Sequence, residues 1–156
     1  MNDDIIERFR IRELIDRYCD AINQRDWAVF ANFWTEDAVW EALEPFNMLA
    51  TGRDQVLKTI REARDRNPFL TQIAHAVVID AVGAETARAH QTLYVICKSP
   101  TGTGYSSIGL YSDELRRTPD GWRFRKRTYR PSWFDPEPPK GYVIESAIQA
   151  KSRGAF

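Results

Sequence analysis

The segment RYCDAINQRDW, residues 17–27, carries three oxygen-bearing side chains at intervals of three residues: Asp20, Asn23 and Asp26. Farther along the chain, the segment TQIAHAVVID contains His75, one of only two histidines in the sequence. Histidine exchanges a proton near neutral pH, so His75 is the best candidate for a general base. Whether these side chains do proton-transfer chemistry depends on whether the elements that carry them face a common cavity.

A helical pattern over residues 5–22 places the three oxygen-bearing side chains differently. At about 100° per residue, Asp20 lies opposite the apolar stripe and is expected to be solvated. Asn23 lies at the flank of the stripe near the helix end, where it either reaches the edge of a cavity or has no role. Asp26 is expected to cap a second helix, whose inner face holds Trp27, Phe30, Ala31 and Trp34.

The rest of the chain predicts one more helix and then a series of strands. RDQVLKTIREARDR, residues 53–66, is amphipathic and is followed by a proline that ends the helix. A strand, a turn near Pro45 and a short return strand are expected before it. Four longer strands follow, at approximately 70–82, 85–98, 104–117 and 122–130. Helices followed by an antiparallel meander indicate an α+β fold with its helices on one face of the sheet.

Alternation along the strand 70–82 assigns His75 to one face with Ile73, Val77 and Ile79. This is the bulkier apolar face, so His75 is expected to point inward. A lone histidine in that position is either a satisfied core residue or a catalyst.

Two further polar positions have simpler interpretations. His90 shares its face with a more polar set of residues and is expected to be structural or exposed. In the last hairpin, Asp113 lies opposite Lys126 or Arg127, which predicts a cross-strand ion pair.

Composition excludes several classes of function. The 22 basic residues balance the 22 acidic ones, so no global field attracts nucleic acid or an anionic membrane. The two cysteines lie far apart without a Cys/His cluster, which predicts reduced thiols and no metal site. Neither an apolar leader nor an apolar stretch of about 20 residues is present. We therefore expect a cytoplasmic protein with no nucleic-acid or membrane partner.

The length of 156 residues and the 43% hydrophobic content suit a single core. We expect one domain over residues 1–135 and a Pro-rich tail over residues 136–156. The segment RPSWFDPEPPKGYV, which spans this boundary, has too many prolines for a central strand and is expected to cross the surface as a strap.

The order of these pieces resembles the SnoaL-like branch of the nuclear-transport-factor-2-like superfamily. The resemblance rests on IRELIDRYCDAINQRDWAVFANFWTEDAVW, then ATGRDQVLKTI, then TQIAHAVVID, and last GLYSDELRRTPDGWRFRKR. It implies a cone-shaped fold in which a strongly curved sheet wraps a long helix around a deep apolar pocket. Members of this branch include scytalone dehydratase, hexachlorocyclohexane dehydrochlorinase, bile acid dehydratase and polyketide cyclases, with dioxygenase β subunits as non-catalytic relatives.

The resemblance also implies roles for individual residues. The dehydratase and dehydrochlorinase members use a histidine base oriented by an aspartate, and these positions correspond here to His75 and Asn23. An amide can orient the imidazole but stabilises imidazolium less than a carboxylate does. The resemblance therefore predicts that Asn23→Asp raises the rate of an elimination. Tyr18 falls where the dehydrochlorinase carries a lysine, and it would supply a phenol donor.

Three hypotheses about function follow. The first is a cofactor-independent lyase of the dehydratase type that acts on a small hydrophobic, cyclic molecule without a metal. The second is an isomerase or cyclase that uses the same pocket, and the third is a non-catalytic ligand-binding protein or subunit. Apolar walls for the substrate are assigned to Trp27, Trp34, Trp40 and Tyr111.

The sheet also predicts self-association. Because the helices cover one face, the other face is expected to be apolar in places, through Leu93, Val95 and Ile108. We expect a homo-oligomer, either a dimer or a trimer.

Overall fold

The computed structural model describes residues 3–144, which form three helices and six strands. The helices are α1 (Asp3–Gln24), α2 (Trp27–Ala31) and α3 (Arg53–Arg66). The strands are β1 (Trp34–Ala42), β2 (Met48–Thr51), β3 (Phe69–Val82), β4 (Thr86–Lys98), β5 (Gly104–Thr118) and β6 (Gly121–Asp135).

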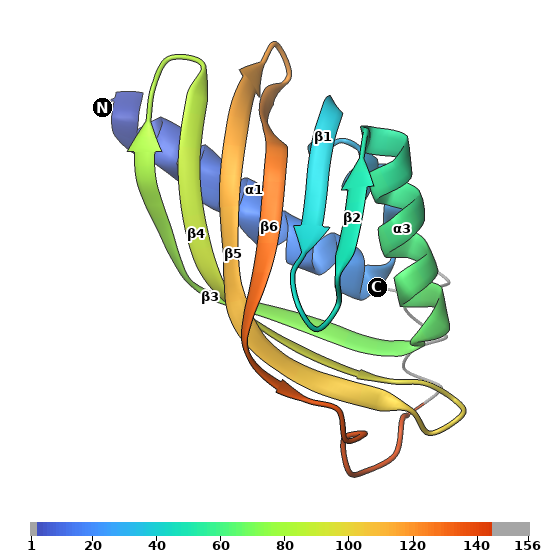
Figure 1. The fold of residues 1–156 in the computed structure, drawn as a ribbon. Helices are drawn as coiled ribbons and strands as arrows, with labels where there is room; N and C mark the ends of the chain where they lie inside the picture. The colour runs from blue at the N-terminus through green and yellow to red at the C-terminus, as the bar shows by residue number, and fades with distance from the viewer. Residues whose placement is uncertain (1–2, 145–156) are drawn as a thin grey trace.

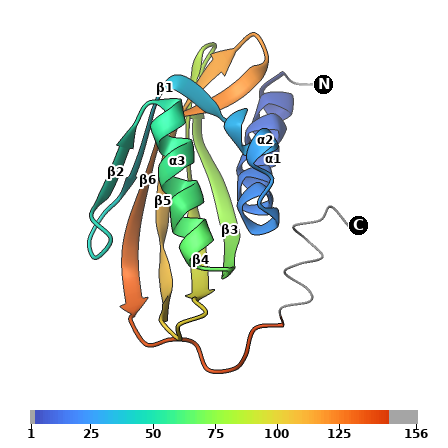
Figure 2. The same ribbon diagram turned by 90° about the vertical axis from the view of Figure 1, so that its right-hand side faces the viewer.

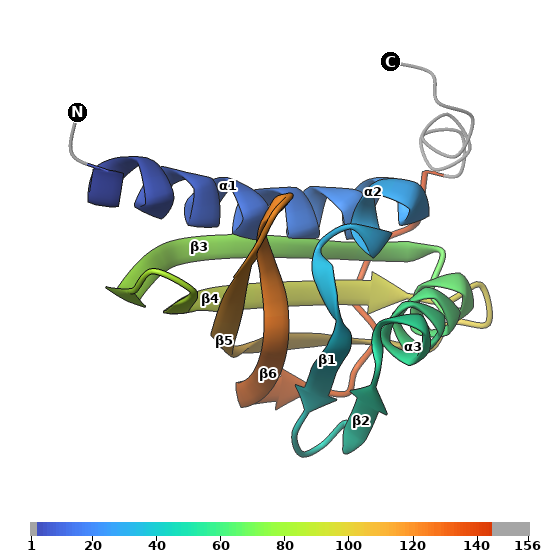
Figure 3. The ribbon, with the colours of Figure 1, turned by 90° about the horizontal axis from the view of Figure 1, so that it is seen from above.

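One sheet contains all six strands in the order β2-β1-β6-β5-β4-β3. Every neighbouring pair is antiparallel except β1 and β6, which are parallel. The long strands bend strongly along their length, and α1 crosses behind them (Figure 1). Turned views show α1 running alongside β3 and α3 lying next to β1 and β2 (Figures 2 and 3). The predicted α+β fold, with helices packed on a strongly curved and mostly antiparallel sheet, is confirmed.

The apolar stripe of α1 forms the helical side of the core. Ile11, Ile15, Tyr18 and Ile22 are buried against the sheet, whereas Asp20 is exposed as the helical angle predicts. Burying one stripe of this kind supplies most of the stability of an amphipathic helix, because propensity alone rarely holds one in water.

The second helix begins as predicted. A carboxylate oxygen of Asp26 accepts a hydrogen bond from the backbone N–H of Val29 at 3.0 Å and caps α2. The cap satisfies one of the backbone donors that a helix start leaves free.

A bulge in β3 changes which residues of that strand face the core. Ala76 has a φ of 52°, and the pairing with β4 shifts between His75 and Val78. Before the bulge, Leu70 and Ala74 face the core, and after it Val77 does. Because one extra residue reverses the alternation, the residues on the two sides of Ala76 do not share a single face.

The prediction that the chain from Arg130 leaves the sheet is wrong over its first residues, because β6 continues to Asp135. Pro131 pairs with Gly109 of β5, beyond Tyr129, which is the last residue of β6 paired with β1. On the side that faces β1, β6 is unpaired beyond Tyr129, so the absence of an N–H in proline removes no hydrogen bond between strands. A Cβ on Gly109 would lie 2.5 Å from the carbonyl oxygen of Arg130, so this close approach requires glycine.

The two faces of the sheet also differ from the expectation. Leu93 and Val95 are 1% and 5% exposed and belong to the core, so their assignment to the outer face is wrong. Ile108 is on the outer face, where Ile73, Tyr94, Ile108 and Trp133 pair across β3, β4, β5 and β6. We call these four residues the outer stripe, and Ile73 and Trp133 are about half exposed, at 53% and 48%.

Candidate functional site

An inner cavity of about 80 Å³ lies between α1, α3 and the concave face of the sheet. Its lining is mostly aromatic and aliphatic, with few polar atoms. The lining residues are Tyr18, Ile22, Trp40, Ala42, Phe46, Met48, Ile60, Ala63, Arg64, Leu70, Gln72, Leu93, Val95, Tyr105, Tyr111 and Tyr129. An apolar cavity with a few polar groups is typical of a site for a small molecule.

Three of the predicted site residues meet in this cavity. The indole N–H of Trp40 donates a hydrogen bond of 3.0 Å to the hydroxyl oxygen of Tyr111. The rings of Tyr111 and Tyr18 contact each other edge to face, with centroids 6.1 Å apart. Because Tyr111 uses an oxygen lone pair for Trp40, its own O–H can still donate to a ligand.

Burial keeps both of these phenols protonated. It raises the pKa of Tyr18 well above the ordinary value, with the neighbouring Tyr111 adding to the effect. Burial also raises the pKa of Tyr111, against an opposing effect of Arg127. A phenol whose pKa is raised stays neutral at physiological pH, so both side chains are hydrogen-bond donors and neither is a base.

Gln72 adds an acceptor to the same cavity. Its side-chain Oε1 is buried, and it has no hydrogen-bond partner among the described residues. A buried amide oxygen without a partner is costly unless a ligand or water donates to it. The cavity therefore offers the phenols of Tyr18 and Tyr111 as donors and the amide oxygen of Gln72 as an acceptor, beside the other polar lining residues Arg64, Tyr105 and Tyr129.

A buried ion pair lies directly beneath the tyrosines. Arg127 donates from Nε and Nη2 to the two carboxylate oxygens of Asp113, at 2.8 and 3.1 Å, and both side chains are 0% exposed. The guanidinium carbon of Arg127 lies 4.0 Å from the ring centroid of Tyr18 and 4.1 Å from that of Tyr111. The predicted cross-strand pair is confirmed, with Arg127 as the partner, and it supports the floor of the cavity.

His75 does not reach this cavity. The side chain is exposed on the outer face of β3, opposite Thr92 of β4, because the bulge at Ala76 lies between it and the inward-facing Val77. The predicted inward orientation is wrong, whereas Val77 and Ile79 do pack on the core as expected. His90 is also on the outer face, where its Nδ1 lies 2.9 Å from a carboxylate oxygen of Asp80.

Asn23 clamps α1 to β3 and does not orient a histidine. Its Nδ2 donates to the carbonyl oxygen of Gln72, and its Oδ1 accepts from the Gln72 backbone N–H, each at 2.8 Å. The side-chain amide thus pairs with both backbone groups of one residue, as a neighbouring strand would. The clamp holds β3 in the position from which the Gln72 side chain enters the cavity.

Substitutions of Asn23 should therefore change stability. Asn23→Asp retains an acceptor for the Gln72 N–H but sets a carboxylate against the Gln72 carbonyl, and Asn23→Leu loses both bonds. We expect each to lower the free energy of unfolding by about 1–3 kcal/mol. Urea denaturation checks this, with Gln24→Ala as a control at the neighbouring, half-buried position of α1. Unchanged stability of both variants would refute the clamp.

The other predicted walls are divided between cavity and core. Trp40 and Tyr111 line the cavity, but Trp34 is fully buried in the core, and its ring centroid lies 5.4 Å from that of Phe124. Trp27 packs on Phe30 outside the cavity, at a centroid distance of 5.8 Å.

Several lining residues were not predicted. Tyr105 and Tyr129 alternate inward along β5 and β6 in phase with Tyr111, so strand alternation carries a signal for both. Alternation also places Gln72 on the face of Leu70 and Ala74, which is the opposite of the face predicted to point inward, whereas Arg64 carries no signal because its position depends on how α3 packs.

The cavity is small for a ligand in this structure. Ligand pockets usually hold roughly 300–1,000 Å³, whereas this one holds about 80 Å³. Phe46 and Met48, from the β1–β2 hairpin, are half-buried lining residues. A cyclic ligand therefore requires this wall to move outward.

Within residues 3–144, no three or more His, Cys, Asp and Glu side chains gather where they could hold a metal ion. Over the same residues, no helix is both long and apolar enough to cross a bilayer.

Comparison with known families identifies the class of protein. Residues 3–128 match the SnoaL-like domain, so the chain belongs to the SnoaL-like family. No curated protein matches the chain.

Several solved structures share this fold. A protein provisionally named a scytalone dehydratase, from Novosphingobium aromaticivorans, is 19% identical with a TM-score of 0.78, covering 92% of this chain and 99% of its own. Hexachlorocyclohexane dehydrochlorinase LinA-type3 from Novosphingobium barchaimii is 19% identical with a TM-score of 0.78, covering 90% and 97%. Rv3472(D26N) from Mycobacterium tuberculosis, a protein of unknown function, is 21% identical with a TM-score of 0.73, covering 99% and 90%. At these identities the likeness shows the fold alone.

Proposed function

We propose that the inner cavity binds a small, hydrophobic, cyclic molecule that carries an oxygen, and that the protein is a cofactor-independent lyase of the dehydratase type. The observation that carries this proposal is that the phenols of Tyr18 and Tyr111 line one mostly apolar cavity together with Gln72, whose side-chain oxygen has no partner among the described residues. Relatives of this fold named dehydratase and dehydrochlorinase support the choice of an elimination.

The tyrosines would act as proton donors. One phenol gives its proton to the leaving hydroxyl, which departs as water, while the other donates to a carbonyl oxygen of the substrate. The C–H proton passes to a water admitted with the substrate and from there returns to the phenolate, so the tyrosine is regenerated. A substrate whose C–H bond is already acidified by a carbonyl or an aromatic ring suits this weak base.

The pH dependence separates this proposal from a histidine base. Because burial raises the pKa of Tyr18 and of Tyr111, both stay protonated, and the rate should be flat from about pH 6 to about pH 9. With a histidine base the rate would fall below about pH 6.5. Steady-state turnover across this range checks the prediction, and an acid limb that disappears in His75→Ala would contradict it.

A second candidate is a non-catalytic ligand-binding protein. Within residues 3–144, no histidine and no carboxylate lines the inner cavity, so the described part of its lining has no side chain that is a base at neutral pH. Binding without turnover needs only the donors, the acceptor and the apolar walls.

A ligand screen followed by a turnover assay tests both candidates. Cyclic ketones and β-hydroxy ketones of steroid, polyketide and chlorinated-ring classes would be screened by thermal shift with the parent and Tyr18→Phe. Tyr94→Phe is the matched control, because Tyr94 is on the outer face. Hits that depend on Tyr18 and lose water in the assay support the lyase, whereas Tyr18-dependent hits that stay intact support the binding protein. Hits that bind Tyr18→Phe and the parent equally well would overturn both.

We also propose that the chain forms a homo-oligomer through the outer stripe. Burying four paired apolar side chains against a second copy removes them from water at about 25 cal/mol per Å². Ile108→Glu should shift the chain to a monomer, because it places a charge at the centre of the stripe. Light scattering at micromolar concentration checks this, with Leu49→Glu as a control on exposed β2. A parent that is already monomeric would refute the proposal.

A further inference from the structure

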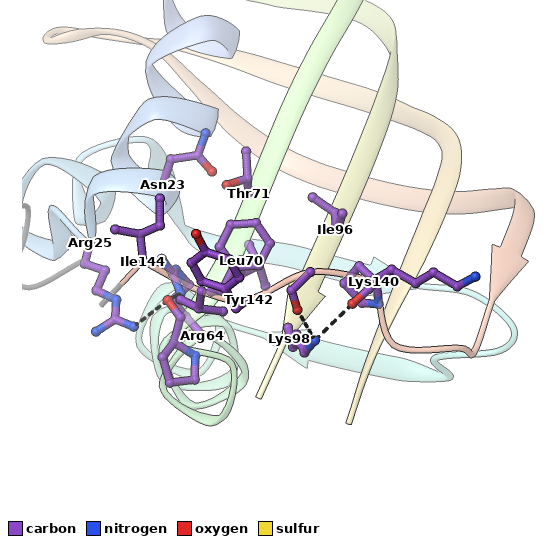
Figure 4. Close-up of a pocket in the computed structure, with 15 residues that line it drawn as sticks. Asn23, Arg25, Arg64, Leu70, Thr71, Ile96, Lys98, Lys140, Tyr142 and Ile144 are labelled. Atoms are coloured by element: carbon purple, nitrogen blue, oxygen red, sulfur yellow. Dashed lines mark hydrogen bonds between the residues drawn. The ribbon is translucent and has the colours of Figure 1, made fainter. Parts of the chain in front are cut away.

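A second hollow lies outside the sheet, under the C-terminal segment formed by residues 139–144. It holds about 360 Å³, within the range that small ligands occupy. The ends of α1, α3 and β4 and the start of β3 surround it (Figure 4). The residues that line it are Asn23, Arg25, Arg64, Pro68, Phe69, Leu70, Thr71, Ile96, Lys98, Pro139, Lys140, Gly141, Tyr142, Val143 and Ile144. We call it the outer pocket.

The charge of the outer pocket is one-sided. Among residues 3–144, its lining includes four cations, Arg25, Arg64, Lys98 and Lys140, and no aspartate or glutamate. The chain as a whole carries no net charge, so this concentration is a local feature. A hollow with one sign of charge attracts small ions of the opposite sign.

Main-chain carbonyls orient these cations but do not neutralise them. Lys98 donates to the carbonyl oxygens of Pro139 at 3.1 Å and of Gly141 at 2.7 Å, which also holds the C-terminal segment over the pocket. Arg25 Nη2 donates to the carbonyl oxygen of Pro68 at 3.2 Å. Carbonyl dipoles satisfy donors, whereas only an anion offsets the cost of burying the charge itself.

Arg64 is the most buried of these cations, at 4% exposed. Its Nη1 donates to the carbonyl oxygens of Asn67 at 2.6 Å and of Pro68 at 2.8 Å. Burial and, after it, the charge of Arg25 lower the pKa of Arg64 to about 10, against an opposing effect of Asp65. The two guanidinium groups therefore repel each other across Pro68, and an anion placed beside both would relieve that repulsion.

Arg25 occupies its position at a conformational cost. Its φ is 62°, in the left-handed region that favours glycine at a helix end. Its Nε is buried and has no hydrogen-bond partner within the described part of the chain. A strained backbone position whose side chain carries a charge and an unpaired N–H donor is typical of a binding site.

The remaining lining is apolar and incompletely covered. Leu70 is buried and Ile96 is half-buried at the base of the pocket, whereas Tyr142 and Ile144 at its rim are 89% and 62% exposed. A ligand with an apolar body would cover these two side chains while its charged end contacts the arginines.

We propose that the outer pocket binds an amphipathic organic anion, a carboxylate with an apolar body, whose oxygens contact Arg25 and Arg64 and whose body lies under Tyr142. Charge-assisted hydrogen bonds from guanidinium to carboxylate supply the specificity, and the apolar lining supplies the remaining affinity. This site is separate from the inner cavity, although Arg64 and Leu70 line both. The proposal does not depend on lyase activity.

Calorimetric titration of the full chain with octanoate tests the proposal. We expect octanoate to bind, acetate and octanamide to bind at least about tenfold more weakly, and added salt to weaken octanoate binding. Arg25→Gly should lower octanoate affinity about tenfold or more while leaving the fold intact, because glycine relieves the positive φ. Tyr142→Ala removes an apolar contact at the rim and should also weaken binding.

Two control variants complete the design. Arg130→Gln removes an exposed charge of β6, away from the outer pocket, and should leave octanoate affinity unchanged. Tyr18→Phe alters only the inner cavity and should also leave it unchanged. The proposal is overturned if octanoate does not bind, if octanamide binds equally well, or if Tyr18→Phe and not Arg25→Gly lowers the affinity. A failure to find lyase turnover has no bearing on these results.

Discussion

Asp113→Ala is expected to lower the free energy of unfolding by about 3–5 kcal/mol, because it leaves the charge of Arg127 buried without its partner. Arg127 is 0% exposed, and its Nη1 already lacks a hydrogen-bond partner among the described residues. The guanidinium therefore has no nearby acceptor that could replace the carboxylate of Asp113. Three aromatic rings contact its guanidinium, and these stabilise a cation far less than a carboxylate does. Urea denaturation of the parent and the variant measures the loss.

Asp37→Ala is the matched control for this prediction. Asp37 pairs with Arg116 and Arg125, but its side chain is 52% exposed. Exposed ion pairs contribute about 0–1 kcal/mol, so the control should stay close to the parent. The double variant Asp113→Leu/Arg127→Met removes both charges and should recover most of the loss. A loss in Asp113→Ala no larger than that in Asp37→Ala would contradict the account of the buried pair.

Tyr18→Phe is expected to lower kcat by about 10²–10³-fold on any substrate that the parent turns over, because a donor to developing negative charge is lost. Tyr111→Phe should have an effect of similar size, with an added loss of stability because the indole N–H of Trp40 loses its acceptor. Steady-state kinetics of purified variants measure both.

His75→Ala provides the contrast to the tyrosine variants. The side chain is exposed on the outer face, so its removal should leave kcat within about twofold of the parent. Circular dichroism of all variants excludes misfolding as the cause of a lost rate. Loss of activity in His75→Ala with retention in Tyr18→Phe would assign the chemistry to the outer face and contradict the proposed site.

The elements could be predicted from sequence because their signals are local. The stripe of α1, the cap at Asp26 and the amphipathic pattern of α3 each depend on residues within one or two turns. The strand 70–82 was also predicted nearly to its ends, which are Phe69 and Val82 in the structure.

The orientation of His75 could not be predicted in the same way. The segment around His75 is apolar on both faces, so the alternation of residue types does not reveal an extra residue in the strand. Residue 76 is an alanine, and unlike a glycine it gives no indication in the sequence of a positive φ. One bulge moved His75 out of the cavity and left Gln72 in it. The site therefore depends on a register shift that arises only when β3 pairs with β4 and packs on α1.

The sequence signals for the remaining site residues were mixed. Tyr18 was assigned from its place on the apolar stripe of the first helix and Tyr111 only as an aromatic wall, and both line the cavity. Trp34 was expected on the inner face of the second helix, but α2 ends at Ala31 and Trp34 begins β1 as a core residue, since aromatic side chains fill cores as readily as they line cavities.

A crystal structure with the first ligand from the screen tests the central claim most directly, namely that the inner cavity is the ligand site. The account predicts the ligand ring between Trp40 and Gln72, with a ligand oxygen within about 3.2 Å of the hydroxyl of Tyr18 or Tyr111. It also predicts that Phe46 and Met48 are displaced outward relative to the unliganded chain. A ligand bound beside His75 on the outer face, with the inner cavity unchanged, would contradict the account.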